Sequence, residues 1–284
     1  MKHVHYVTLT MAAAVLACGP ALQQAATPSS ETKLPLSETE TAVYQGITET
    51  LTASANPTTT VPEEAILILT PANSSRLVGQ VHVEGIADST FEQTLVLAVV
   101  LLGEPERMLA QQPVIIQAEL GQRGPFAADV AFTYSGPADQ PGEIRVYASS
   151  PRDGGITHLA SAQVMLAASG APDIRTADPH SELIAISSPS PGGTIRGGVA
   201  HVEGIGLASF EQTLVVEVYD QDGRLAGSSP VTVEAPDYGV RGPFTVDVPY
   251  TISVAGAGRI VVRDPSPAFG QMLHLASVEV RIEP

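Results

Sequence analysis

Cysteine and tryptophan are nearly missing from this sequence, which has one cysteine and no tryptophan in 284 residues. A single thiol has no partner for a disulfide within the chain, so a folded core has to hold by packing alone. Aromatic residues make up only 5% of the chain, which gives little support to a carbohydrate-binding or base-stacking surface. The composition therefore excludes a scaffold held by disulfides.

Basic residues are also scarce, because 14 Lys and Arg stand against 30 Asp and Glu, a formal net charge of −16. Such a polyanion repels nucleic-acid phosphates, and no cluster of basic residues with interleaved aromatics offers a local exception. Anionic lipid headgroups would repel the protein surface as well. We therefore expect no nucleic-acid partner, and we expect membrane attachment to depend on acyl chains.

The N-terminus carries a short apolar run, which follows Lys2 and extends from Tyr6 to Ala17. It is too short to span a bilayer, and small residues at its end are typical of a secretory signal. The ending Leu16-Ala17-Cys18 resembles the bacterial lipoprotein box, in which the cysteine is lipidated and becomes the new N-terminus. This resemblance implies a signal peptide at 1–17, lipidation of Cys18, and a lipid anchor in a bacterial membrane, with the protein facing outside the cytoplasm. Cleavage by the ordinary signal peptidase, with Cys18 discarded, is the alternative.

Residues 18–64 differ in composition from everything that follows. The segment is dense in Thr, Ser, Pro, Ala and Glu, and it has too few large apolar residues to offset the entropy of ordering it. We expect a disordered tether there and a shorter linker at 168–182. Two domains are then expected at 65–167 and 183–284.

An internal repeat supports this division of the chain. Residues 82–96 read HVEGIADSTFEQTLV and residues 201–215 read HVEGIGLASFEQTLV, with 11 of 15 positions identical. A repeat of roughly 100 residues is the size of one folding domain. The chain is therefore interpreted as a tandem duplication.

Each unit has short segments of alternating or continuous apolar residues that Gly and Pro separate, with no helical period. Seven or eight such strands at about ten-residue spacing indicate a β-sandwich, and a barrel is the lesser possibility. The expected strands are 65–69, 78–86, 94–102, 114–120, 126–134, 143–149 and 158–166 in the first unit, and 183–187, 198–205, 210–219, 231–234, 244–252, 259–263 and 274–282 in the second.

The third strand differs between the units. In 210–219 apolar residues alternate with polar ones, whereas 94–102 is apolar on both faces. We expect something to cover the second face of 94–102. The following turns differ too: Asp220-Gln221-Asp222-Gly223 is typical of a hairpin, and Gly103-Glu104-Pro105-Glu106 is longer.

Both units resemble the immunoglobulin-like domain of bacterial spore germination. The shared pattern is an apolar strand ending in Ser/Thr-Pro, then Val-x-Val-x-Gly, Phe-Glu, a long apolar strand and Gly-Pro-Phe. It stands at Thr70-Pro71, Val81–Gly85, Phe91-Glu92 and Gly124–Phe126 in the first unit, and at Ser188-Pro189, Val202–Gly204, Phe210-Glu211 and Gly242–Phe244 in the second. The resemblance implies two tandem immunoglobulin-like β-sandwich domains, an extracytoplasmic role, and no known catalytic residues.

Two pairs of polar residues on strands raise the question of a metal site. His82 and Glu84, with their counterparts His201 and Glu203, could each contribute two ligands, but a closed site needs more. No third ligand is identifiable, so we expect these side chains to be structural or solvated.

The other polar motifs do not predict a reaction either. His158 and His274 each precede Leu-Ala-Ser, which places Ser161 and Ser277 nearby, but no acid completes a triad. Phe91-Glu92 and Phe210-Glu211 are interpreted as a core residue followed by a carboxylate that accepts backbone N–H bonds. The stretch Asp220–Gly223 lacks the later ligands of a calcium loop. We expect no catalytic residues, no cofactor and no metal.

The leading hypothesis is a non-enzymatic surface lipoprotein whose two domains present loops or sheet edges to an envelope or extracellular protein partner. Two linked weak sites gain avidity, which suits a duplication. A link to spore germination rests on the resemblance alone. The alternatives are a small-ligand receptor or a hydrolase that uses the loops of one domain, for which a deep polar pocket in one unit would be the sign, and a mechanical spacer.

Overall fold

The computed structural model describes residues 61–208, 211–268 and 270–284, and it is built almost entirely of strands. The predicted signal peptide, Cys18 and the predicted tether up to residue 60 lie outside the described residues. In the described part, no helix is long and apolar enough to cross a membrane. Both repeats belong to one compact unit, Thr59–Pro284.

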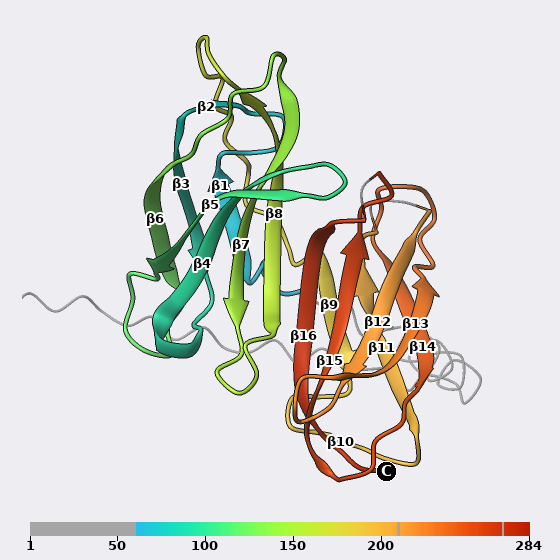
Figure 1. The fold of residues 1–284 in the computed structure, drawn as a ribbon. Helices are drawn as coiled ribbons and strands as arrows, with labels where there is room; N and C mark the ends of the chain where they lie inside the picture. The colour runs from blue at the N-terminus through green and yellow to red at the C-terminus, as the bar shows by residue number, and fades with distance from the viewer. Residues whose placement is uncertain (1–60, 209–210, 269) are drawn as a thin grey trace, which may run out of the picture. The chain divides into compact units, whose positions relative to one another are not determined.

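In the described residues each repeat forms eight strands, and Figure 1 labels them along the ribbon. The first repeat contains β1 (Ile66–Thr70), β2 (Arg76–Val78), β3 (Gln80–Ala87), the short 3₁₀ helix η1 (Phe91–Gln93), β4 (Thr94–Leu101), β5 (Arg107–Ile115), β6 (Gly124–Ala131), β7 (Gln140–Ser149) and β8 (Ile156–Ala167). The second contains β9 (Ile184–Ser188), β10 (Thr194–Ile195), β11 (Val199–Gly206), β12 (Thr213–Tyr219), β13 (Leu225–Thr232), β14 (Gly242–Pro249), β15 (Gly256–Pro265) and β16 (Met272–Ile282).

The strands of each repeat form two layers. In the first repeat β3 pairs with β1 and β6, and the other layer has the order β5, β4, β7, β8, with all of these neighbours antiparallel. The second repeat has the same arrangement, with β9, β11 and β14 in one layer and β13, β12, β15 and β16 in the other. The predicted all-β class and the two sandwich units are confirmed.

The most strongly repeated residues of the sequence build the core. In β3 Val81 and Val83 are buried while His82 and Glu84 are exposed, as the period of two requires. A Cβ atom at Gly85 would lie 2.5 Å from Cζ of Phe126, and one at Gly204 would lie 2.5 Å from Cζ of Phe244. Glycine is therefore needed at both positions so that the phenyl ring of the adjacent strand can fill the core.

The predicted bounds of strands β5 and β13 were wrong. The sequence favoured 114–120 and 231–234, but the strands are β5 at Arg107–Ile115 and β13 at Leu225–Thr232. Each pairs on one side only, and most of its residues are exposed or half-buried, so hydrophobic alternation is weak there. A short apolar stretch at the strand's end gave the stronger signal.

Strand β4 is buried on both faces, as its apolar sequence predicted. Leu95, Leu97 and Val99 face the sandwich core, while Ala98 and Val100 join a separate cluster with Tyr147. In contrast, the turn Asp220–Gly223 is an ordinary hairpin, because the Asp220 N–H donates to the Arg224 carbonyl and Gly223 has a φ of +73°.

Candidate functional site

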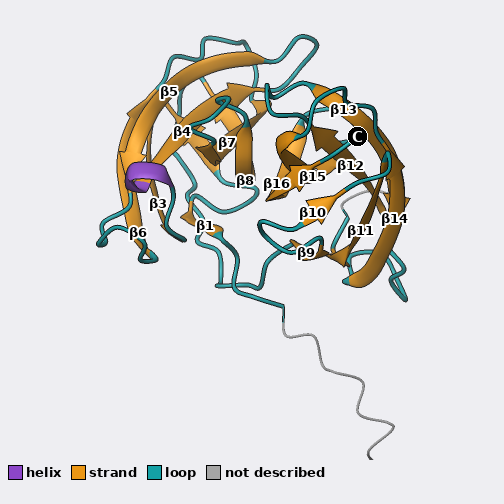
Figure 2. Ribbon diagram, turned by 90° about the horizontal axis from the view of Figure 1, so that it is seen from below, coloured by secondary structure: helices purple, strands orange, loops and turns teal. Residues whose placement is uncertain are grey.

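The two repeats meet along strands β8 and β16, which pair antiparallel (Figures 1 and 2). Leu159 lies opposite Leu275, and each is the counterpart of the other in its own repeat. The contact therefore has a local two-fold axis, and the sheet layer of one repeat continues into that of the other.

Apolar burial stabilises this contact. Leu159 and Leu275 are 2% and 3% exposed and cluster with Val261. Burying a leucine side chain fully contributes roughly 1.5–3 kcal/mol relative to leaving it exposed. The three residues thus give the repeats a small shared core of their own.

Hydrogen bonds obey the same local symmetry. The Ser161 hydroxyl donates to the carbonyl of Leu273 at 2.7 Å, and the Ser277 hydroxyl donates to the carbonyl of Thr157 at 2.7 Å. These two serines follow the histidines that the sequence pointed to, but their hydroxyls are bound to backbone oxygen. They hold the repeats together, and neither is placed as a nucleophile beside a histidine.

The segments in front of β1 and β9 also pair with each other. Glu63 and Ser181 form an isolated antiparallel bridge. The Glu182 N–H donates to the Pro62 carbonyl at 2.9 Å, and the Glu64 N–H donates to the His180 carbonyl at 3.3 Å. Two segments 118 positions apart in the chain are thereby brought to the same point.

Four side chains converge there, and we refer to Glu64, His158, Glu182 and His274 as the junction cluster. His158 Nε2 lies 3.1 Å from Glu64 Oε1 and 3.7 Å from Glu182 Oε1. His274 Nε2 lies 2.8 Å from Glu182 Oε1 and 3.9 Å from Glu64 Oε1. One ligand atom from each of the four residues lies within 4.8 Å of all the others, so the four residues could hold a metal ion.

The second oxygen of each carboxylate is held by the opposite segment. The Ala65 N–H donates to Glu182 Oε2 at 2.8 Å, and the Leu183 N–H donates to Glu64 Oε2 at 3.1 Å. Both carboxylates are thereby fixed with Oε1 facing the two imidazoles, whose rings meet edge to face with centroids 5.1 Å apart.

Charge interactions outweigh burial at His158 and Glu182. Burial opposes the charged form of His158, but the hydrogen bond to Glu64 and the charges of Glu182 and Glu64 raise the pKa of its imidazole above the ordinary 6.5. Burial likewise opposes ionisation of Glu182, yet its bonds and charges with His274 and His158 hold the pKa of the carboxyl below 4.5. These contacts favour the imidazolium form of His158 and the carboxylate form of Glu182.

The sequence pointed to only half of this cluster. His158 and His274 stood out, but Glu64 and Glu182 are the last residues of the segments assigned to tether and linker. Their common position, two residues before β1 and β9, was the available signal. It could not be recognised without knowing that the two segments pair.

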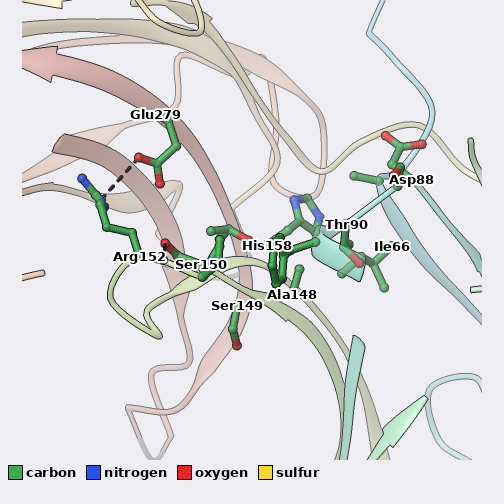
Figure 3. Close-up of a pocket in the computed structure, with 14 residues that line it drawn as sticks. Ile66, Asp88, Thr90, Ala148, Ser149, Ser150, Arg152, His158 and Glu279 are labelled. Atoms are coloured by element: carbon green, nitrogen blue, oxygen red, sulfur yellow. Dashed lines mark hydrogen bonds and ion pairs between the residues drawn. The ribbon is translucent and has the colours of Figure 1, made fainter. Parts of the chain in front are cut away.

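A cavity of about 430 Å³ opens beside His158 (Figure 3). Ile66 and Ala148 contribute apolar walls, and Arg152 forms an ion pair with Glu279 at 3.3 Å across the repeats. A second cavity, of about 350 Å³, is lined by His158 and Glu182 among others. His158 therefore borders both cavities, and they offer access from solvent to the junction cluster.

The His-Glu pairs on β3 and β11 have different surroundings. His201 Nδ1 lies 2.7 Å from Asp247 Oδ1, while its Nε2 lies 3.1 Å from Glu203 Oε1. His82 Nδ1 similarly lies 2.9 Å from Asp129 Oδ1. Because the acidic groups use opposite nitrogens of the ring, they do not converge on one point, and the side chains are exposed.

The Phe-Glu interpretation was wrong for the first repeat, and Phe210 lies outside the described residues. Phe91 is 58% exposed and Glu92 is exposed too, with a φ of +55°. The next residue, Gln93, is buried instead, and its Nε2 donates to the carbonyls of Glu119 and Gln122 at 3.0 and 2.9 Å. The left-handed turn aims the amide, rather than the phenyl ring, into the interior.

In the second repeat a matching amide lies in the same place. Gln212 Nε2 donates to the Asp237 carbonyl at 3.1 Å. Each repeat thus has a glutamine that ties the loop before the fourth strand to the loop after the fifth. We refer to these loops, 88–93 with 116–123 and, of the described residues, 207–208 and 211–212 with 233–241, as the clamped loop pairs.

The layers, the strand order and the duplicated site define a tandem immunoglobulin-like β-sandwich protein. The family model for the immunoglobulin-like domain of bacterial spore germination matches residues 65–155 and 183–271, and the chain belongs to this family. The predicted resemblance is therefore confirmed. All four residues of the junction cluster lie just outside the matched ranges.

Other comparisons add little to this assignment. No curated protein matches the chain. Among solved structures, the crystal structure of CBD12 from CALX1.2 is 11% identical, with 77% of this chain and 100% of that chain covered and a TM-score of 0.21.

Proposed function

We propose that this protein is a non-enzymatic binding module, anchored outside the cytoplasm through lipidated Cys18, that engages a protein partner with its clamped loop pairs. The observation that carries this proposal is the exposure of large apolar side chains at these loops in both repeats. Phe91 and Leu120 are 58% and 77% exposed in the first, and Tyr238 and Val240 are 76% and 43% exposed in the second. Exposed aromatic and aliphatic groups on a fixed loop are suited to protein recognition.

Four of the edge strands are less suited to binding than the loops. Strands β5, β6, β13 and β14 each pair on one side only, and all four contain proline: Pro113, Pro125, Pro230, and Pro243 with Pro249. Proline has no N–H to donate to an added strand, and it is a common protection of edge strands. Of the two surfaces expected from the sequence, loops and edges, the loops are favoured.

Duplication gives this binding module two sites. The ladder between β8 and β16 joins the repeats, so both clamped loop pairs belong to one unit. Two weak contacts made together bind far more tightly than either one alone. The arrangement therefore favours a repetitive partner or a partner with two similar surfaces.

A catalytic role has less support. Within the described ranges, Ser161 and Ser277 are bound to carbonyl oxygens, and the sequence has no common hydrolase motif. The cavity beside His158 is large enough for a small ligand, but residues of both repeats line it. It is not the deep polar pocket of one domain that a receptor or a hydrolase would favour.

The anchor and the binding surface can be tested separately. Mass spectrometry of the mature protein tests the anchor, since lipidation predicts an N-terminal diacylated Cys18 that is lost in Cys18→Ala. For the binding surface, proximity labelling in cells would compare the wild type with a Phe91→Ser, Leu120→Ser and Tyr238→Ser variant. We expect the labelling of a specific neighbour to fall at least tenfold.

Val254→Ser is the matched control, because Val254 is 62% exposed and lies in the loop between β14 and β15, at the other end of its sandwich. The same neighbours, labelled equally in the wild type and in the loop variant, would contradict the proposed surface. Loss of labelling in both variants would show that it does not depend on the clamped loop pairs.

A further inference from the structure

We propose that the junction cluster binds one divalent transition-metal ion of the zinc class, through Nε2 of both histidines and Oε1 of both glutamates. Each repeat supplies one histidine and one glutamate. The ion would link β8 and β16 to the segments in front of β1 and β9, and so would join the repeats at their local two-fold axis.

The four His-Glu distances lie near those of tetrahedral coordination. Ligands about 2.0–2.1 Å from zinc lie about 3.4 Å from one another at the corners of a tetrahedron. The four His-Glu distances of the junction cluster are 2.8, 3.1, 3.7 and 3.9 Å and scatter around this value. Changes of up to about 0.6 Å would bring these four distances to the tetrahedral value.

Backbone contacts already orient the ligands. Oε2 of each glutamate accepts a backbone N–H from the segment that carries the other glutamate, which directs Oε1 at the histidine Nε2 atoms, where the ion would replace the His-Glu contacts. Such outer contacts fix a ligand's direction and are a usual part of metal sites. The sandwich fold alone does not require them, because the segments of Glu64 and Glu182 precede the first strand of each repeat.

The donor set selects the class of metal. Two imidazoles and two carboxylates suit zinc and its neighbours in the first transition row, whereas Ca²⁺ prefers six to eight oxygen ligands. The charges balance as well, since one divalent cation compensates two carboxylates in a buried site. His158, with a side chain 14% exposed, borders both cavities and provides access for the ion.

The first experiment uses the full chain, purified in detergent and stripped with a chelator. Zinc would be added, the protein separated by gel filtration, and the metal counted by mass spectrometry. We expect one zinc per chain. Cobalt(II) in its place should give the intense visible absorption of a tetrahedral site, and zinc should abolish that absorption by competition.

Variants then locate the ion. His158→Gln and His274→Gln should each weaken zinc binding by more than the 10- to 100-fold that loss of an outer contact costs. The control is the exposed pair on β11: a variant with His201→Gln and Glu203→Gln also removes a histidine and a carboxylate and should bind zinc like the wild type. Circular dichroism checks that each variant is folded.

The outcomes separate the alternatives. A folded wild-type chain that retains no stoichiometric zinc, or a weak octahedral cobalt spectrum, would overturn the proposal and identify the junction cluster as closed ion pairs. Zinc binding that the β11 control loses and the cluster variants keep would overturn it as well. If the cluster variants do not fold, the stoichiometry and the cobalt spectrum of the wild type still decide.

Discussion

The two repeats share their core and their contact at the two-fold axis, but they differ on the sheet faces beside that contact. Phe126 corresponds to Phe244 and Leu159 to Leu275, whereas Ala98 corresponds to Glu217. Near the axis a residue of one repeat contacts its counterpart in the other repeat, so both repeats keep the same residue type there. Away from the axis each side meets a different surface, and the copies are free to diverge.

One buried ion pair illustrates this divergence. Arg259 of β15 is 2% exposed and lies 3.1 Å from Asp153, which belongs to the first repeat. At the corresponding position of β7 stands Glu143, a buried residue of opposite charge, whose partner is Arg145 of its own strand at 2.6 Å. The Arg259–Asp153 ion pair between the repeats therefore has no counterpart on the other side of the axis.

The largest expected effect tests how alike the two cores are. Phe126→Ala and Phe244→Ala each empty the space beside a core glycine, and we expect each to lower the free energy of unfolding by about 3–5 kcal/mol. Equilibrium denaturation of the full chain measures this. If the repeats unfold together, both variants shift one common transition by similar amounts.

A clear difference between the losses of unfolding free energy in these two variants would show that the two cores are not equivalent. Two separate transitions, each sensitive to only one variant, would show that the contact between β8 and β16 does not couple the repeats. Leu97→Val serves as a milder control in the same core, since it removes a single methylene from a residue 1% exposed.

The next effect concerns the face on which the repeats differ. Glu217 is paired with Arg263 at 2.9 Å and accepts a hydrogen bond from Tyr219. At the corresponding positions the first repeat has Tyr147 and Val100, which offer no cation. Arg145 of β7 lies opposite Ala98, but it is already paired with Glu106 and Glu143. Ala98→Glu should therefore bury a carboxylate that has no cation of its own, and should lower the free energy of unfolding by about 2–4 kcal/mol.

A double-mutant cycle with Tyr147→Arg supplies the control. The arginine would stand where Arg263 stands in the second repeat, so it should recover part of the loss caused by Ala98→Glu. Additive effects of the two substitutions would contradict the view that the missing cation is the cause. Calorimetry or denaturation of all four proteins gives the coupling energy.

The sequence predicted best what local patterns determine. Alternating residues placed β3 and β11, and the doubly apolar run placed β4 with both faces buried. The edge strands β5 and β13 were misplaced because only one neighbour and part of one face constrain their residues. The prediction for Phe91 was wrong because Glu92 and Gln93 form a left-handed turn, with φ of +55° and +53°. This turn buries the side chain of Gln93 and leaves that of Phe91 exposed.

Only the two histidines of the junction cluster could be singled out from the sequence. Its histidines lie on a predictable strand, but Glu64 and Glu182 lie in segments whose composition resembles that of a linker. They are brought together by pairing between residues more than 100 positions apart, which is a tertiary contact without a local signal. In the sequence, the sign of the cluster is that each repeat has an acidic residue two positions before its first strand, β1 or β9.

A smaller effect is expected from pH in the chelated, metal-free protein. The folded pKa of Glu182 is depressed, so its contribution to stability is present above pH 4.5 and is lost as the pH falls through the folded pKa. The folded pKa of His158 is raised, so its contribution is present below pH 6.5 and is lost as the pH rises through the folded pKa. The melting temperature should therefore be highest between these values.

Single variants separate the two limbs of this profile. Glu182→Gln should reduce the loss of melting temperature at acidic pH, and His158→Gln should reduce the loss at alkaline pH. Glu64 and His274 are unchanged in both variants and still lie beside the substituted side chain. A profile that keeps both limbs in both variants would assign the pH dependence to other groups.

The smallest effect is a local titration on β11, and it separates an exposed histidine from a buried one. Hydrogen bonds from His201 to Asp247 and then to Glu203 raise the pKa of its imidazole above the ordinary 6.5. Asp247→Asn removes the larger contribution, so the pKa measured by proton NMR should fall toward 6.5. Because the ring is exposed, the melting temperature should not change.

A fall in pKa accompanied by a loss of stability would show that this His-Glu pair supports the fold as the junction cluster does. An unchanged pKa would show that the contact with Asp247 is not held in solution.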